Sequence, residues 1–241
     1  PIMYANDLDI DIDNHDSNHD HEGMVYFTDS GNIPPALNHG HAKPWYDTFR
    51  SFTLTYLQGS ATGRLLSYNL KTGETGVLID GGIWYANGTA LSHDGTWIAV
   101  VETCTCRVYK HWLKGPKKGE TELWIPSLPG FPDNICRSSD GKTYWVCIVA
   151  PDVPLLRKIV QCKRLRWLAA HLPELLKPKP KKMGMVLRVD EWGEVVDVLS
   201  DDGGVNVAFV SSVSESRDGK TLWLGNVVED YVSSLDLGQL H

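Results

Sequence analysis

Short runs of alternating polar and apolar residues recur along the chain, and each run is interrupted by a tight turn. Four segments share one order, namely a short strand-like run, an Asp-Gly or similar turn, and a more apolar run; they cover residues 5–30, 86–102, 133–147 and 211–225. Such alternation is typical of β-hairpins, and Asp-Gly supplies the positive φ angles that a tight turn needs. The pattern therefore predicts four hairpins at related positions of a repeat.

The spacing of the hairpins predicts an all-β fold of the β-propeller type. The turn glycines Gly95 and Gly141 are 46 residues apart. Further strands are expected after the second and third hairpins, over residues 107–113, 121–126, 185–190 and 194–199. Four strands in about 45 residues is the spacing of a propeller blade. A parallel α/β fold is excluded, because helical stretches do not separate the strands.

The repeats fill about four blades. The last unit has three predicted strands, over residues 211–217, 221–227 and 231–237, and the segment 1–12 already serves as the inner strand of its own unit. Four blades of this size close a ring poorly. We therefore expect residues 1–241 to form a single partial domain, an N-terminally truncated fragment of a six-bladed β-propeller.

One insertion, residues 152–183, has a helical and basic pattern. Its apolar residues recur at steps of three and four from Leu155 to Leu176, and the segment from Arg157 to Lys182 carries a net charge of +8. One interpretation is a cap over a mouth of the propeller, with a solvated basic face. The other is contact with a partner or an anionic membrane surface, through Arg157, Lys158, Arg164, Arg166 and Trp167.

Composition narrows the function classes. The chain has 241 residues, 42% of them hydrophobic, and a formal net charge of -7, which argues against general nucleic-acid binding. No stretch approaches the roughly 18–20 apolar residues of a membrane-spanning helix. The chain begins at Pro1 rather than Met, so the lack of a visible targeting signal excludes nothing.

Several strings together resemble the strictosidine synthase-like family, in the branch of the adipocyte plasma membrane-associated proteins. They are residues 25–30, 63–68, 85–96, 101–103, 109–119 and 128–135. The resemblance implies a six-bladed propeller with wider kinship to paraoxonases and gluconolactonases. It also implies a place in the secretory pathway or endomembrane system, on the lumenal or extracellular side.

The same resemblance implies a calcium site. In paraoxonase-like relatives, a calcium ion in the central channel polarises an ester or lactone carbonyl. Calcium takes about 6–8 oxygen ligands, and Asn6, Asn87 and Asn134 stand at one position of three consecutive repeats, with Asp133 beside the last. We expect their side chains to converge on one axis and hold calcium. The alternative is that these asparagines cap turns or satisfy backbone groups where strands begin.

Departures from the family pattern bear on the chemistry. The acidic calcium ligand of such relatives comes from the first blade, which we expect this chain to lack, and the paraoxonase histidines either lie in the same missing part or have no counterpart here. Matching Glu215 to the second glutamate of strictosidine synthase puts Ser211 at the catalytic position, and serine cannot take the proton that the condensation requires. The leading hypothesis is a calcium-dependent hydrolase of the arylesterase or lactonase type, acting on a small-molecule ester or lactone. The alternatives are a non-catalytic binding propeller and, less favoured, a condensing enzyme.

Three other features attract attention. His15, His19 and His21 lie among carboxylates, and His39 and His41 form a His-x-His pair; we interpret both as solvated loops rather than metal sites. Glu102 could face the channel. Tryptophans that recur at one repeat position are expected to pack between blades; they are Trp97, Trp145 and Trp223.

Overall fold

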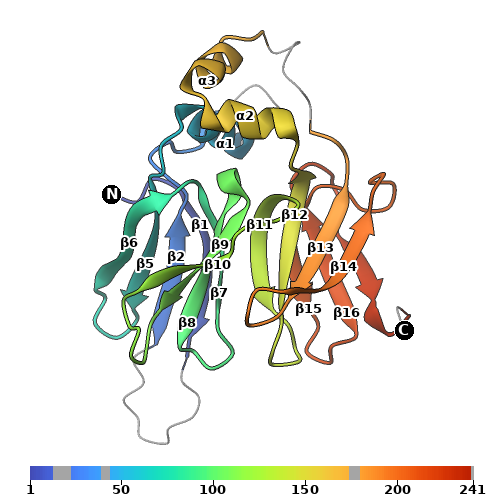
Figure 1. Ribbon diagram of the computed structural model, residues 1–241. Coiled ribbons are helices and arrows are strands. Elements are labelled where there is room, and N and C mark those ends of the chain that lie inside the picture. The colour runs from blue at the N-terminus through green and yellow to red at the C-terminus, as the bar shows by residue number, and fades with distance from the viewer. Residues whose placement is uncertain (13–22, 39–43, 174–179, 240–241) are drawn as a thin grey trace, which may run out of the picture.

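The computed structural model describes residues 1–12, 23–38, 44–173 and 180–239 and consists mainly of four antiparallel sheets in a β-propeller arrangement (Figure 1). The first sheet has the order β1 (Ala5–Asp11), β2 (Met24–Asp29), β5 (Gly63–Asn69), β6 (Thr75–Ile83). The second is β7 (Ala86–Leu91), β8 (Trp97–Glu102), β9 (Arg107–Trp112), β10 (Thr121–Ile125). The third is β11 (Gly130–Arg137), β12 (Tyr144–Pro151), β13 (Gly184–Val189), β14 (Val195–Asp201), and the fourth is β15 (Val210–Glu215), β16 (Thr221–Asn226), β17 (Ser233–Asp236). The predicted four-blade arrangement is confirmed.

The turns between the first two strands of each blade follow from local sequence. Gly95, Gly141 and Gly219 adopt φ angles of 66°, 72° and 69° in the three Asp-Gly turns. The aspartate before each glycine adds a side-chain cap; Asp140 Oδ1, for example, accepts from the backbone N–H of Lys142 and of Thr143, both at 2.9 Å. These turns pair each inner strand with its neighbour, which leaves β1, β7, β11 and β15 side by side in the middle of the molecule.

Neighbouring inner strands are joined through side chains rather than through a backbone ladder. Asp7 Oδ2 accepts from the backbone N–H of Thr89 and Asp9 Oδ2 from that of Leu91, both at 2.8 Å. Because alternate residues of a strand point to one side, the two β1 carboxylates reach two amides of β7. The carboxylates thus satisfy backbone donors of β7 that no β-strand pairs.

Apolar cores fill the spaces between blades. Trp97 is buried between the second and third sheets, and Trp145, 1% exposed, is buried between the third and fourth. Trp223, at the equivalent position of the fourth sheet, is 50% exposed. No described sheet covers that face of the fourth blade, so the inter-blade packing of Trp223 stays a prediction.

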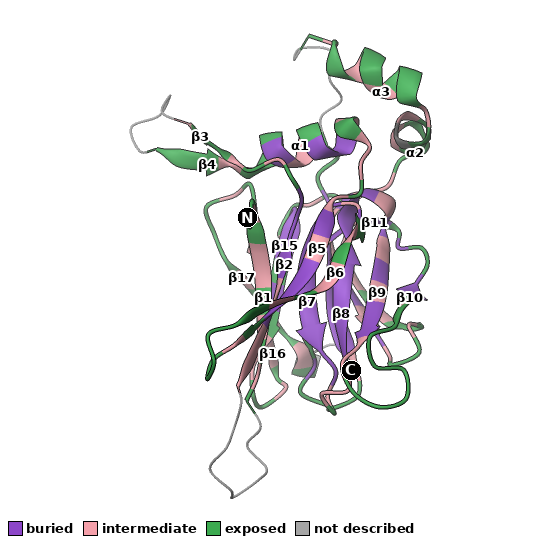
Figure 2. Ribbon diagram, turned by 90° about the vertical axis from the view of Figure 1, so that its left-hand side faces the viewer, coloured by how far each residue is buried: buried purple, intermediate pink, exposed green. Residues whose placement is uncertain are grey.

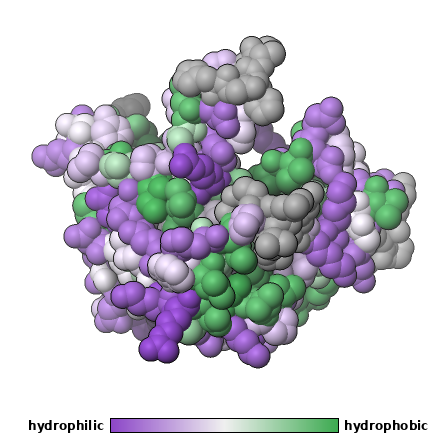
Figure 3. All heavy atoms as spheres, turned by 90° about the horizontal axis from the view of Figure 1, so that it is seen from above, coloured by the Kyte–Doolittle hydropathy of each residue, from purple (hydrophilic) through white to green (hydrophobic). Residues whose placement is uncertain are grey.

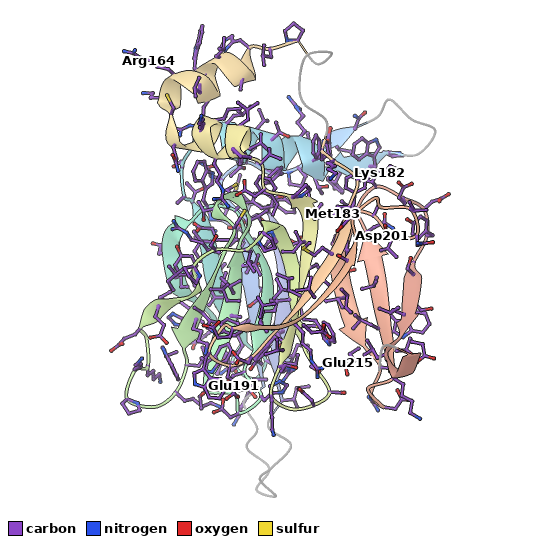
Figure 4. The ribbon with its side chains drawn as sticks, turned by 45° about the vertical axis from the view of Figure 1, so that its right-hand side comes forward. Arg164, Lys182, Met183, Glu191, Asp201 and Glu215 are labelled. Atoms are coloured by element: carbon purple, nitrogen blue, oxygen red, sulfur yellow. The ribbon has the colours of Figure 1, made fainter. Side chains whose placement is uncertain are left out.

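Glu215, at the end of β15, joins the fourth blade to the third (Figure 4). Its carboxylate accepts from Trp145 Nε1 and Ser139 Oγ, both at 2.6 Å, and from Ser139 N at 3.2 Å. Burial raises the pKa of Glu215, but these hydrogen bonds outweigh it and hold the pKa below its usual value. The ionised carboxylate therefore stabilises the contact between the two blades.

We expect Glu215→Ala to lower the free energy of unfolding by about 2–4 kcal/mol, because it also leaves the Trp145 indole N–H buried without an acceptor. Urea unfolding followed by circular dichroism measures the change. A group with a depressed pKa stabilises the fold above its unfolded pKa and loses that contribution as the pH falls. The difference between Glu215→Ala and wild type should therefore shrink below about pH 4. A variant as stable as wild type at neutral pH would contradict this role.

Three helices and a hairpin stand over one end of the sheets (Figures 1 and 2). They are α1 (Thr48–Gln58), α2 (Pro154–Gln161), α3 (Lys163–Ala170) and the pair β3 (Ala36–Asn38) and β4 (Trp45–Asp47). The insertion contains two helices, α2 and α3, which meet at Cys162. The repeat pattern did not predict α1 or the hairpin.

Candidate functional site

In all four blades, the pairing between the inner strand and the next strand is irregular at the candidate residues. The register shifts between Ala5 and Leu8 in β1 and between Ala86 and Thr89 in β7. It shifts again between Pro132 and Ile135 in β11 and between Val210 and Ser212 in β15. The residues inside these intervals include Asn6, Asn87, Asp133, Asn134 and Ser211. Irregularities of this kind turn side chains away from the ladder and are common beside active sites, so the equivalence of these positions extends from sequence to backbone.

Asn87 has a buried carboxamide whose orientation is determined by its neighbours. The Thr103 hydroxyl donates to Pro132 O at 2.8 Å, so it can only accept from Asn87 Nδ2, which lies 3.0 Å away. Asn87 Nδ2 therefore faces Thr103, and Asn87 Oδ1 is buried without a hydrogen-bond partner. The Thr28 hydroxyl also donates to Asn87 O at 2.7 Å, which holds the backbone at this point.

Asn134 has a second side-chain carbonyl oxygen that is buried and has no hydrogen-bond partner. Its Oδ1 is buried and unpartnered, and the two asparagine oxygens are the only side-chain carbonyl oxygens of that kind in the described residues. The backbones that carry them are in close contact, since a Cβ built on Gly88 would lie 2.5 Å from Asn134 Cα. Buried acceptors almost always have a partner, so the two unpartnered oxygens set Asn87 and Asn134 apart from the other buried side-chain carbonyls of the described residues.

Asp133 lies beside these amides on β11. Burial raises its pKa to about 7, a hydrogen bond from the Asn87 side chain opposes this, and the charge of Asp7 adds to it. Asp7 was not predicted as part of the site. Its pKa is raised mainly by burial, while hydrogen bonds from the backbone of Thr89 and Leu8 oppose the rise. The site thus holds a carboxyl that loses its proton near neutral pH.

Asn6 and Ser211 extend the row of equivalent positions into the first and fourth blades. Asn6 Nδ2 donates to Ser30 Oγ at 2.8 Å. Ser211 is buried on β15. The structure brings Asn87, Asp133 and Asn134 together; the convergence of Asn6 and Ser211 with them on one ion stays a prediction.

Aromatic side chains lie at the same end of the inner strands. Tyr4 and Tyr85 precede the asparagine segments of β1 and β7, and their rings form an edge contact with centroids 6.0 Å apart. From α1, Phe52 packs on Tyr85 at 5.2 Å and on Phe131 at 6.2 Å. Tyr85 adopts a φ of 67°, which is strained for a non-glycine residue. The polar group therefore lies beneath an apolar layer that α1 completes.

The remaining candidate residues from the sequence are not part of this group of side chains in the described structure. Glu102 is buried, accepts from Trp84 N at 2.7 Å, and also accepts from the Thr105 hydroxyl, so it holds the adjoining loop together. The histidines at 15, 19, 21, 39 and 41 lie outside the described residues. Within the described ranges, no cluster of three His, Cys, Asp or Glu side chains suits a metal; the oxygen set above is built mainly from amides.

The basic insertion presents most of its predicted contact residues to solvent. Arg157, Lys158 and Arg164 are exposed, and Trp167 is 63% exposed. Arg157 also forms an ion pair with Asp152. Arg166 differs, because its guanidinium lies 5.9 Å from the centroid of the Trp84 ring and against Gly59. It fastens α3 to the rest of the molecule.

Comparisons of the sequence with protein families and with curated proteins point to the same group of proteins. The family described as strictosidine synthase matches residues 9–116. Protein STRICTOSIDINE SYNTHASE-LIKE 13 of Arabidopsis thaliana is 34% identical, with 98% of this chain and 50% of that protein covered. The adipocyte plasma membrane-associated protein of Salmo salar is 31% identical, with 99% and 53% covered. The chain therefore spans about half the length of these relatives.

Solved structures give the fold. One similar structure is a chain in the crystal structure of a nidogen/laminin complex, with a TM-score of 0.56 and 11% sequence identity. The match covers 98% of this chain and 62% of that chain. In the described residues, no helix is long and apolar enough to cross a membrane. The identity to the curated relatives over nearly the whole chain and the family match over residues 9–116 agree: the chain is similar to the strictosidine synthase-like proteins.

Proposed function

We propose that this propeller is a calcium-dependent hydrolase of small-molecule esters or lactones, of the arylesterase or lactonase type. The observation that carries the proposal is the pair of buried, unpartnered oxygens of Asn87 and Asn134 beside the carboxyl of Asp133. From its similarity to the strictosidine synthase-like proteins, we further propose that the protein works on the lumenal or extracellular side of the secretory pathway or endomembrane system.

The donor set fits calcium. Amide and carboxylate oxygens are the ligands that Ca²⁺ prefers, and neutral amides bind it without accumulating negative charge. Asn87, Asn134 and Asp133 would hold the ion, and Asn6 would complete the set from β1. When bound, calcium supplies a Lewis acid that polarises a substrate carbonyl oxygen.

The chain's own residues orient this set. Thr103 holds the Asn87 amide so that its oxygen, rather than its nitrogen, is available. Asp133 contributes negative charge once the pH exceeds about 7. Phe52, Tyr85 and Phe131 form an apolar layer suited to the hydrocarbon part of an ester, and such a layer excludes bulk water from the polar group.

Ser211 argues against a condensing enzyme of the strictosidine synthase type. It lies on the inner strand of the fourth blade, at the position to which the family resemblance assigns the catalytic glutamate of the synthase, and its hydroxyl is not a base near neutral pH.

We expect Asn87→Ala to weaken calcium binding by at least about tenfold and to abolish chelator-sensitive hydrolysis of phenyl acetate and simple lactones, because it removes one ligand oxygen. Titration calorimetry with CaCl₂ measures binding, and assays with and without EDTA measure turnover. Asn69→Ala is the control, since Asn69 caps a turn through Lys71 N and Thr72 N at the other end of the blade. Hydrolysis that is indifferent both to EDTA and to Asn87→Ala would overturn the proposal.

A further inference from the structure

The helices α1, α2 and α3 and the β3–β4 hairpin stand over one end of the sheets (Figure 1), and α1 covers the channel residues from that side through Phe52. The Tyr56 hydroxyl of α1 donates to Leu156 O of α2 at 2.9 Å, and Arg166 of α3 lies against Gly59, directly after α1. The three helices are therefore fastened together, and α3 lies farthest from the sheets. A rigid, outward-facing platform results.

The charge of this platform is opposite to that of the rest of the molecule. The three helices contain six basic residues and no Asp or Glu; the basic residues are Arg50, Arg157, Lys158, Lys163, Arg164 and Arg166. Because the whole chain has a net charge of -7, the remainder carries -13. A surface with such segregated charge attracts an anionic partner. The helices themselves carry no carboxylate that would repel it.

The exposed side of α3 combines these charges with apolar side chains. Cys162, Arg166 and Ala169 face inward or are partly buried, whereas Lys163, Arg164, Leu165, Trp167 and Leu168 are exposed. The Trp167 ring packs against the His171 ring in a tilted arrangement with centroids 4.2 Å apart, which holds the indole at the surface. Seen from above, hydrophobic side chains form patches among hydrophilic ones (Figure 3).

We propose that this platform binds anionic phospholipids in the lumenal or extracellular leaflet that the protein faces, with α3 lying in the interface and Trp167 and Leu168 entering the headgroup region. An indole beside exposed leucine and flanked by Lys and Arg is the combination that interfacial helices use. A purely acidic protein surface would use the charges but would not need the exposed indole. The proposal is independent of the hydrolase chemistry, because none of these residues belongs to the channel group.

Vesicle flotation with purified protein tests the proposal. We expect binding to vesicles of phosphatidylcholine with phosphatidylserine and much weaker binding to phosphatidylcholine alone. Lys158→Glu/Lys163→Glu/Arg164→Glu should reduce binding to the anionic vesicles by at least about 100-fold, from roughly fivefold for each charge. The matched control is Lys118→Glu/Lys142→Glu/Lys220→Glu, three exposed lysines in turns at the opposite end, where Glu191 and Glu215 lie far from Arg164 (Figure 4).

A second pair of variants distinguishes entry of the Trp167 side chain into the membrane from attraction by charge alone. Trp167→Ala should weaken binding by about tenfold and should do so at high salt as well, because the lost contact is hydrophobic. Trp192→Ala is its control, since Trp192 is 79% exposed in the β13–β14 turn at the other end. Equal binding to both vesicle types, equal losses in the control variants, or unchanged binding of Trp167→Ala would each overturn the proposal.

Discussion

Calcium binding is expected to weaken about tenfold for each pH unit below about 7, because protons compete with calcium for Asp133. Burial raises the pKa of this carboxyl to about 7, so it is mainly protonated at pH 6 and mainly ionised at pH 8. Titration calorimetry with CaCl₂ from pH 5 to pH 8 measures the dependence. Asp133→Asn should bind calcium weakly at every pH and lose most of this slope, because asparagine does not titrate.

The Asp133 carboxyl also affects the stability of the calcium-free protein. A rise in pH strengthens calcium binding but lowers this stability. The unfolded chain ionises this carboxyl near pH 4, whereas the folded protein retains the proton up to about pH 7. Stability in EDTA therefore falls across that interval, by up to about 4 kcal/mol. Asp133→Asn should remove this loss and be more stable than wild type at pH 8 without calcium. Asp218→Asn, in an exposed turn, should leave the calcium profile unchanged; equal calcium affinity of wild type at pH 6 and pH 8 would refute the assignment.

Gly88→Ala is expected to destabilise the protein by about 3 kcal/mol or to prevent folding, because the added Cβ has no space. It would lie 2.5 Å from Asn134 Cα, 2.7 Å from Asp133 O and 2.8 Å from Ile135 N, all of them backbone atoms. Relief requires β7 to move away from β11, which would also separate Asn87 from Asn134. Urea unfolding and the calcium-induced rise in Tm measure the two consequences.

Gly203→Ala provides the matched control for that substitution. Its Cβ would meet only side-chain atoms, Val205 Cγ2 at 3.3 Å and Asp201 Oδ1 at 4.0 Å, so we expect a change within about 0.5 kcal/mol. If Gly88→Ala unfolds at the same urea concentration as Gly203→Ala, the close approach of the two inner strands is not needed for the fold.

The sequence alone predicted features that depend on a few neighbouring residues. Alternation and Asp-Gly turns act locally, so the hairpins around Gly95, Gly141 and Gly219 were predicted close to their observed positions. The equivalence of Asn6, Asn87 and Asn134 also came from the repeat, and the irregular ladders now place these residues alike in the backbone. Helix α1 had local signals too, since Asp47 caps it at Arg50 N and Gly59 ends it with a φ of 70°. They were obscured because its threonines and aromatics favour strands.

Tertiary structure decided which side chains are covered, which are partnered and how they are charged. Trp145 and Trp223 occupy one repeat position, yet only Trp145 has a neighbouring blade against it. Arg166 looks like another surface cation in sequence but lies over Trp84, and the pKa of Asp133 follows from burial beside Asp7. Burial, desolvation and hydrogen-bond partners are set by residues far apart in the chain. Local pattern therefore determined the elements and their repeat, while contact between blades determined the chemistry of the site.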